Sequence, residues 1–157
     1  MPEAMHPLKA IRREVVWILT AADIEINVGS GRKRPSILVN PPSGGAAPQS
    51  SLPAIFVYPR SEQRLESSSS TDEQRVLVDV VMQSYGNDDE ALDHVDDMQL
   101  AVEIAILANP RLSGLAMGIR ATGSEIDTVQ GEVSFAVRRV TFEVRREMPR
   151  NDPTVTY

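Results

Sequence analysis

Hydrophobic residues recur at helical spacing near the beginning of the chain, with charged and polar residues between them. This pattern predicts an amphipathic helix over residues 7–21, which opens at Pro7 because proline is favoured in the first helical turn. The apolar face of this helix consists of Leu8, Ile11, Val15, Ile18 and Leu19. Trp17 is expected at the margin of that face.

A longer helix is predicted after an acidic segment. Asn87 or Asp88 caps it, and the helix dipole stabilises each carboxylate of the first turns by roughly 0.3–1 kcal/mol. Pro110 and Gly114 end the helix. One apolar stripe consists of Leu92, Val95, Met98, Val102, Ala105 and Ile106, and a second of Leu100, Ile104 and Leu107. Because the second half is apolar over much of its circumference, we expect it to lie between a sheet and another covering surface.

Alternating apolar and polar residues predict several strands. A half-buried strand over 24–28 turns at a glycine-rich segment, and residues 37–39 are its expected hairpin partner. A short strand over 52–58 ends at Pro59.

A long strand is predicted over residues 73–85. Its core face consists of Val76, Val78, Val80 and Met82. Leu77 and Val81 lie on the opposite face, where we expect them to meet a neighbouring subunit.

Two further strands are predicted over 117–127 and 131–147, joined near residue 130. The apolar positions of the last strand are first the odd-numbered Val133, Phe135 and Val137, and then the even-numbered Val140, Phe142 and Val144. We predict a β-bulge at Arg138 and Arg139, since one extra residue keeps both sets on one face. A regular strand of this length would span roughly 55 Å, which is long for a compact domain.

These elements predict an α+β fold, in which two main helices pack on one face of a mixed, mostly antiparallel sheet. The whole chain, 1–157, is read as a single domain because its 157 residues are too few for two. Composition predicts mobile loops at about 40–51 and 60–72, which are rich in Pro, Gly or Ser, and a frayed polar tail over 149–157.

The composition narrows the function. A net charge of −6 argues against general binding to nucleic acids or anionic membranes. The absence of cysteine excludes disulfides, thiolate metal sites and cysteine nucleophiles. No apolar run approaches the roughly 20 residues of a membrane span, so we expect the chain to fold in a cytoplasm.

The acidic start of the second helix is the strongest candidate for a metal site, because oxygen ligands suit calcium or magnesium. The acidic residues are Asp88, Asp89, Glu90, Asp93, Asp96 and Asp97, with His94 among them. They lack the order of an EF-hand loop and point in several directions, so a solvated helix start is favoured and no metal or other cofactor is predicted. His6 and His94 are both expected to be exposed.

The basic segment Arg32, Lys33 and Arg34 follows two glycines and is interpreted as a hairpin tip, with contact to an anion or a partner as the alternative. Serines 67–70 form a low-complexity loop without a nucleophile motif. Arg138 and Arg139 either contact a partner or occupy a solvent face. No catalytic constellation is present, and we predict that the protein is not an enzyme.

The order of these elements resembles the tail terminator proteins of long-tailed phages, of the minor tail protein U type, which also occur in prophages and gene transfer particles. The resemblance covers residues 5–147. Its most telling segments are LPAIFVYPRSE, QRVLVDVVMQSYG, the helix DDEALDHVDDMQLAVEIAILANP and the strand EVSFAVRRVTFEVRRE.

The resemblance implies a hexameric ring that caps the tail tube, stops its polymerisation and presents a surface to a neck or head-completion protein. DNA would pass through the ring without sequence-specific contact. The protein would then reside at the head-proximal end of the virion tail, after assembly in the host cytoplasm. Asp96 and Asp97 are expected to meet a basic surface of an adjacent subunit or partner, formed by Arg138, Arg139, Arg145 and Arg146.

Three other interpretations stay open. One is a neck or head-completion protein, which differs in its partner. Another is a small metal-binding domain or enzyme that uses the acidic cluster. The last is a plain interaction module.

Overall fold

The computed structural model describes residues 5–29, 31–38, 52–86, 88–129 and 134–155. The helices are α1 (Pro7–Ala21) and α2 (Asp88–Leu107), and a short 3-10 turn, η2, covers Leu112–Gly114. The strands are β1 (Ile26–Val28), β2 (Gly31–Lys33), β3 (Ser36–Leu38), β4 (Ala54–Glu66), β5 (Thr71–Gly86), β6 (Gly118–Val129) and β7 (Ser134–Pro149).

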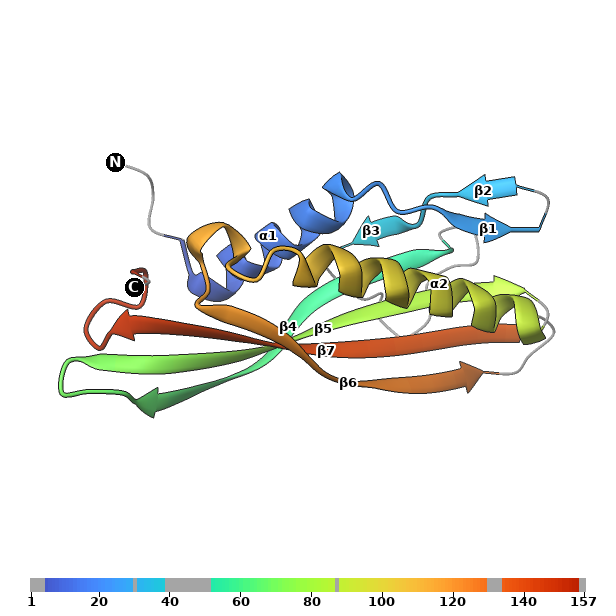
Figure 1. Ribbon diagram of the computed structural model, residues 1–157. Coiled ribbons are helices and arrows are strands. Elements are labelled where there is room, and N and C mark those ends of the chain that lie inside the picture. The colour runs from blue at the N-terminus through green and yellow to red at the C-terminus, as the bar shows by residue number, and fades with distance from the viewer. Residues whose placement is uncertain (1–4, 30, 39–51, 87, 130–133, 156–157) are drawn as a thin grey trace.

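Five strands form one sheet in the order β3-β4-β5-β7-β6, and β1 pairs with β2 in a separate hairpin. Within the sheet, β3 runs parallel to β4, and all other neighbours are antiparallel. Both helices lie on the same side of the sheet (Figure 1). The predicted α+β fold, with two main helices on one face of a mixed, mostly antiparallel sheet, is therefore confirmed.

The main hydrophobic core lies between the helices and the sheet. It follows from the predicted periodicities, because each helix contributes one apolar stripe and β5 contributes alternate residues. Its central residues are Ile11, Val15, Ile18 and Leu19 of α1, Val95, Met98, Val102 and Ile106 of α2, and Val76, Val78, Val80 and Met82 of β5. At the start of α1, the exposed His6 accepts a hydrogen bond from the Leu8 backbone N–H through Nδ1 at 3.2 Å.

A smaller hydrophobic cluster lies on the opposite face of the sheet. Its buried residues are Leu52, Ala54, Phe56 and Val81, with Tyr58, Tyr85, Phe135 and Val137 packed against them. Val81 is only 6% exposed, so the prediction that it faces a neighbouring subunit is wrong. Leu77, on the same face, is half-buried.

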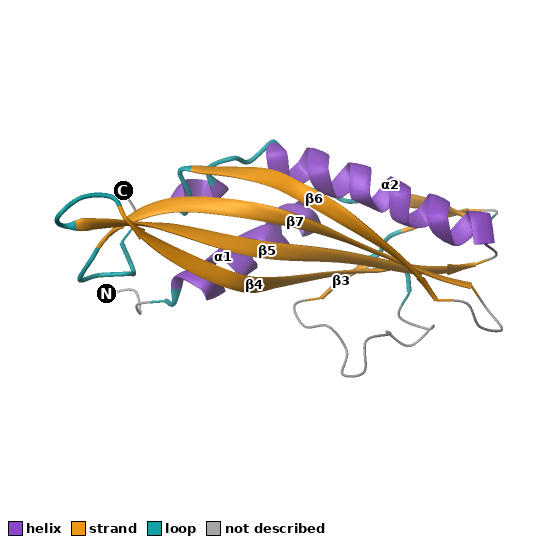
Figure 2. Cartoon of the chain, turned by 90° about the horizontal axis from the view of Figure 1, so that it is seen from below, coloured by secondary structure: helices purple, strands orange, loops and turns teal. Residues whose placement is uncertain are grey.

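The predicted bulge at Arg138 and Arg139 is also wrong. Strands β5 and β7 pair without a register shift over 16 residues of each strand. The change of parity in β7 instead reflects the two clusters, because Phe135 and Val137 face the smaller cluster whereas Val140 faces the helices. Strands of this length span roughly 50 Å, and Figure 2 shows the resulting elongated sheet.

Bulges occur in two other strands. The register shifts between Pro59 and Ser61 in β4 and between Ala121 and Gly123 in β6. Both strands lie toward the outside of the sheet, where bulges are common.

Strand β4 continues well past the expected end at Pro59. Residues 61–66 pair with β5, and the turn between the two strands is limited to 67–70. The predicted loop over 60–72 is therefore wrong at both of its ends. Because nearly all residues of this segment are polar, no hydrophobic alternation marks it, and backbone pairing to β5 supplies the order instead.

The first hairpin closes sooner than predicted. A tight turn at Gly29, whose φ is +55°, brings β2 back against β1. The segment around Ile37 pairs in parallel with β4 instead, so the hairpin expected between 24–28 and 37–39 is wrong. Pro35 lies between the two pairings and separates them.

The chain after β7 folds back on the sheet. Buried Arg146 donates to the carbonyl oxygens of Pro153 at 3.2 Å and Val155 at 3.1 Å, and to Gln74 Oε1 at 3.0 Å. Burial lowers the pKa of Arg146. The frayed tail predicted over 149–157 is thus wrong for residues 149–155. The predicted loop over 40–51, the cap at Asn87 and the strand connection near residue 130 lie outside the described residues.

Candidate interaction surface

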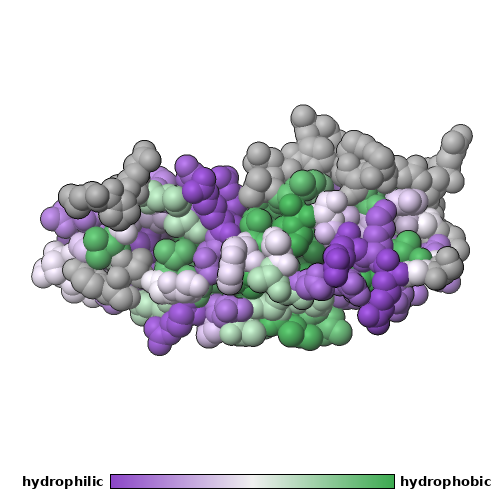
Figure 3. Space-filling view, turned by 90° about the horizontal axis from the view of Figure 1, so that it is seen from above, coloured by the Kyte–Doolittle hydropathy of each residue, from purple (hydrophilic) through white to green (hydrophobic). Residues whose placement is uncertain are grey.

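The outward side of α2 carries a strip of exposed hydrophobic side chains. Leu100 is 61% exposed, Ile104 63% and Leu107 44%, and Trp17 of α1 beside them is 64% exposed. We call these four residues the apolar strip. Figure 3 shows hydrophobic residues gathered midway along the helix-bearing face, with strongly hydrophilic residues to either side. Grouped apolar side chains of this kind mark protein–protein contact sites.

The apolar strip confirms that α2 carries a second apolar stripe, but it corrects the expectation that this stripe is covered. The second apolar stripe of α2 was expected to be covered, but the described residues cover only the stripe that faces the sheet. The sequence signal was the spacing of three and four residues between Leu100, Ile104 and Leu107. This spacing places them together but does not say whether anything covers them.

A shallow groove of about 320 Å³ runs between α1 and α2 beside the strip. Its walls include Trp17 and Ile104, and small alanines at 21, 22, 105 and 108 line the space between them. Small side chains leave room for a partner's side chain, and exposed tryptophan is a frequent anchor of interfaces.

The arginines predicted to meet a partner are instead used within the chain. Arg138 forms an ion pair with Asp96 and donates to Gln99 Oε1 at 3.0 Å, and its side chain is mostly buried. This chain's own β7 therefore supplies a cation to Asp96, and the expected contact of Asp96 with an arginine of another subunit stays a prediction. Asp97, one residue further along α2, is exposed and forms no ion pair within the described residues.

Arg139 belongs to a charged cluster on the sheet face opposite the helices. Its Nε lies 3.6 Å from Asp79 Oδ2, and Arg60 Nε lies 3.4 Å from the same oxygen. Asp79 is fully buried, and its other oxygen accepts a hydrogen bond from Thr141 Oγ1 at 2.8 Å. The sequence signal for this site is an aspartate in the middle of a valine-rich strand.

A second charged group lies further along the same face. Glu73 accepts from Arg145 Nε at 2.8 Å and is 3.2 Å from Arg75 Nη2. The hydrogen bond from Arg145 lowers the pKa of Glu73, and the positive charges of both arginines lower it further against the opposing effect of burial. Arg145 and Arg146 both have partners within the chain, and their pairing with another subunit stays a prediction.

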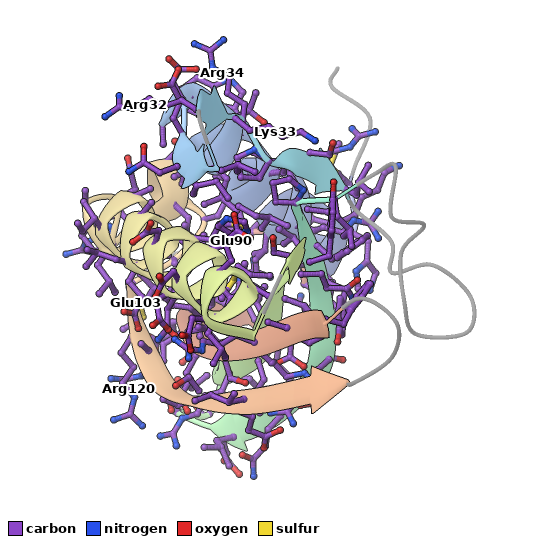
Figure 4. The ribbon with its side chains drawn as sticks, turned by 90° about the vertical axis from the view of Figure 1, so that its right-hand side faces the viewer. Arg32, Lys33, Arg34, Glu90, Glu103 and Arg120 are labelled. Carbon is purple, nitrogen blue, oxygen red and sulfur yellow. The ribbon has the colours of Figure 1, made fainter. Side chains whose placement is uncertain are left out.

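The basic segment after the first turn lies on β2 and the residue that follows it. Arg32 and Arg34 form ion pairs with Glu25 at 3.4 and 3.3 Å, and Arg34 also pairs with Asp23 at 2.8 Å. Lys33 donates to the Leu52 carbonyl at 3.0 Å. Figure 4 shows Arg32 and Arg34 on the outer side of the hairpin and Lys33 turned toward the other side. The chain does turn into a hairpin at Gly29, but Arg32 and Lys33 lie on its second strand and Arg34 follows that strand, so these residues are not at the predicted tip. All three cations have partners within the chain.

The acidic start of α2 surrounds a hollow that also includes His94. The exposed histidine expected there is wrong: His94 is 3% exposed, and its Nδ1 lies 2.7 Å from Ser84 Oγ. Its Nε2 is buried and has no hydrogen-bond partner within the described part of the chain. No group of three or more metal-ligating side chains comes together among the described residues.

The sheet itself has two open edges. Among the described residues, nothing pairs with the outer edge of β6, and β3 covers only Ala54–Phe56 of β4. Because β4, β5, β7 and β6 alternate in direction, β6 and β4 run in opposite directions. The two edges overlap along the sheet at the level of residues 140–145 of β7.

No protein-family model matches the chain, and no curated protein matches it either. Within the described part of the chain, no helix is both long enough and apolar enough to cross a membrane.

Proposed function

We propose that this protein is a structural subunit of a virion, a tail terminator that closes into a ring on the head-proximal end of a phage tail tube. The observation that carries the proposal is the pair of open sheet edges with opposite strand directions. If all copies point the same way around an axis along the strands, β6 of one copy lies antiparallel to β4 of the next. A head-to-tail contact of this kind closes into a ring when its rotation divides the circle.

The edges also carry features that limit other pairings. Pro59 and the bulge beside it interrupt the β4 edge, and charged Arg60 and Arg64 follow. Such features discourage open-ended strand association. The proposed ring therefore uses a restricted stretch of each edge, which sets one register between neighbours.

The mechanism is steric. One face of the proposed ring binds the last ring of tube subunits, and its other face differs from the tube. Polymerisation then ends because no further tube subunit can bind to that other face. The other face receives the neck or head-completion protein. Ring closure places six copies, the number implied by the resemblance, around a lumen through which DNA passes. This function is binding without turnover, with assembly in the host cytoplasm and residence in the virion.

The test is to add the purified protein to polymerising tube protein and to follow tube length and tube ends by negative-stain electron microscopy. Wild-type protein is expected to form closed rings and to shorten the tubes. Ala121→Lys is expected to abolish rings, because Ala121 is exposed on β6 opposite Phe142, within the stretch where the two edges overlap, and an edge lysine opposes strand pairing. Val155→Lys, at an exposed site in the tail, serves as the matched control and should cap normally.

Two outcomes would contradict the proposal. Tubes of unchanged length at saturating protein would exclude the terminator role. Rings that bind a portal or adaptor ring and leave tubes untouched would assign the protein to the neck instead.

A further inference from the structure

We propose that the unassembled protein pairs with a second copy of itself through the outer side of α2, with the two helices antiparallel about a two-fold axis at Ile104. This inference does not rest on the terminator function. It follows from the order of side chains along the exposed side of the helix.

The exposed side of α2 changes character along its length. Asp93 and Asp97 come first, Leu100, Ile104 and Leu107 follow, and Arg111 lies just beyond the helix end. Asp97 precedes Ile104 by seven residues, and Arg111 follows it by seven. The sequence of acidic, apolar and basic side chains is therefore centred on Ile104.

A surface with this order is complementary to itself only when the second copy runs the other way. The antiparallel arrangement places Asp97 of each copy near Arg111 of the other and stacks the apolar residues at the centre. A parallel arrangement would set the acidic ends against each other, which is unfavourable in a chain of net charge −6. Isologous contacts of this type use one patch twice.

The charges at both ends of the strip are available for such a contact. Within the described residues, Asp97 and Arg111 form no ion pair, whereas the neighbouring Asp96 is already paired with Arg138. Both Asp97 and Arg111 are exposed. The distribution of partners thus leaves Asp97 and Arg111, at equal distances in sequence from Ile104, without a counter-ion among the described residues.

Helix α1 extends the complementarity. It lies beside the C-terminal half of α2 (Figure 1), where an antiparallel second copy would carry its acidic first turns. Lys9 and Arg13, both exposed, lie on this side of α1, and the groove beside Trp17 gives room for an aliphatic side chain of the second copy.

This two-fold pair is a different assembly from the proposed ring. In the proposed ring, one rotation axis relates each copy to the next, so a two-fold contact across α2 cannot be the contact between ring neighbours. The pair would therefore cover the apolar strip before assembly and release it when the ring forms. The two contacts use different elements, α2 for the pair and the sheet edges for the ring.

The test is sedimentation velocity over a concentration series, with thermal melting to check folding. Wild-type protein is expected to dimerise, and Ile104→Asp to weaken dimerisation roughly a hundredfold, because two apolar side chains at the axis become two like charges. Ile126→Asp, equally exposed but on β6, should leave the dimer intact. A monomeric wild type at about 100 µM, or a dimer that survives Ile104→Asp, overturns the proposal.

Charge exchange tests the register. Asp97→Arg and Arg111→Asp should each weaken the dimer by roughly three- to tenfold at low salt, since each creates two like-charge contacts. The double variant Asp97→Arg/Arg111→Asp should restore it. If the double variant dimerises no more tightly than either single variant, the proposed antiparallel pairing is overturned. Because the ring assay depends on Ala121 of β6 and this assay on Ile104 of α2, failure of one is distinguishable from failure of the other.

Discussion

On the helix-bearing face of the sheet, α1 and α2 bury the side chains, whereas on the opposite face no described helix lies over the sheet. The first face is built from alternating valines and a methionine, the second from a small apolar cluster and from charged groups around Asp79 and Glu73. Asp79 is as fully buried as the valines, although it is an acid on the uncovered face. Long arginine side chains and cross-strand pairs can therefore bury a charge where no second layer exists.

The comparison predicts unequal responses to substitution, and the largest belongs to the helix-bearing face. Phe142 is almost fully buried in the main core, so Phe142→Ala should lower the free energy of unfolding by about 3–5 kcal/mol. Urea denaturation followed by circular dichroism measures this loss. Ile126→Ala, at an exposed site on β6, is the control and should change stability by no more than about 0.5 kcal/mol. Equal effects of the two substitutions would mean that this face is not the packed core.

The uncovered face should respond less strongly. Asp79→Asn keeps the side-chain shape but removes the charge between Arg60 and Arg139, and we expect a loss of about 1–3 kcal/mol. The loss stays below that of a fully buried ion pair because both arginines are nearly half exposed and can turn to water. Asp97→Asn is the matched control on an exposed helix surface. If Asp79→Asn and Asp97→Asn changed the free energy of unfolding by the same amount, the Asp79 charge would not matter for stability.

The smallest effect is a pH dependence at Glu73. Its pKa is lowered, chiefly by the hydrogen bond from Arg145, so its contribution to stability is present above the ordinary glutamate pKa and disappears as the pH falls through the lowered value. Glu73→Gln should remove this part of the acid sensitivity and cost no more than the roughly 0–1 kcal/mol of an exposed ion pair. Urea midpoints between pH 6 and pH 3 measure it, and Arg145→Gln should give a similar change. A wild-type and a Glu73→Gln profile that run parallel would contradict this assignment.

Much of the fold was predictable from the sequence because it depends on local periodicity. The spacing of Ile11, Val15 and Ile18 predicted α1 with its observed bounds, and alternation in β5 predicted its core face. The two apolar stripes of α2 were visible as well. In each case the order of apolar and polar residues along the chain indicates which residues share a face.

The failures share a cause, which is that pairing between distant strands leaves no local signal. Residues 61–66 look like a loop because nearly all of them are polar, yet pairing with β5 holds them as a strand. The parity change in β7 looked like a bulge because one face was assumed to be the only apolar one. His94 and Arg138 looked exposed because their partners, Ser84 and Asp96, come from elements that only the folded chain brings near.

The sequence by itself therefore determined the elements, the helix-facing core and the apolar strip on α2, since each is a repeat within a few turns or a single strand. Only the tertiary structure decided which charges are already neutralised and which stay available. Asp96 and Asp97 are adjacent and chemically alike, but β7 places Arg138 beside the first, and no described residue forms an ion pair with the second. That difference depends on where α2 and β7, which are distant in sequence, meet in space, and side-chain order along one helix cannot contain it.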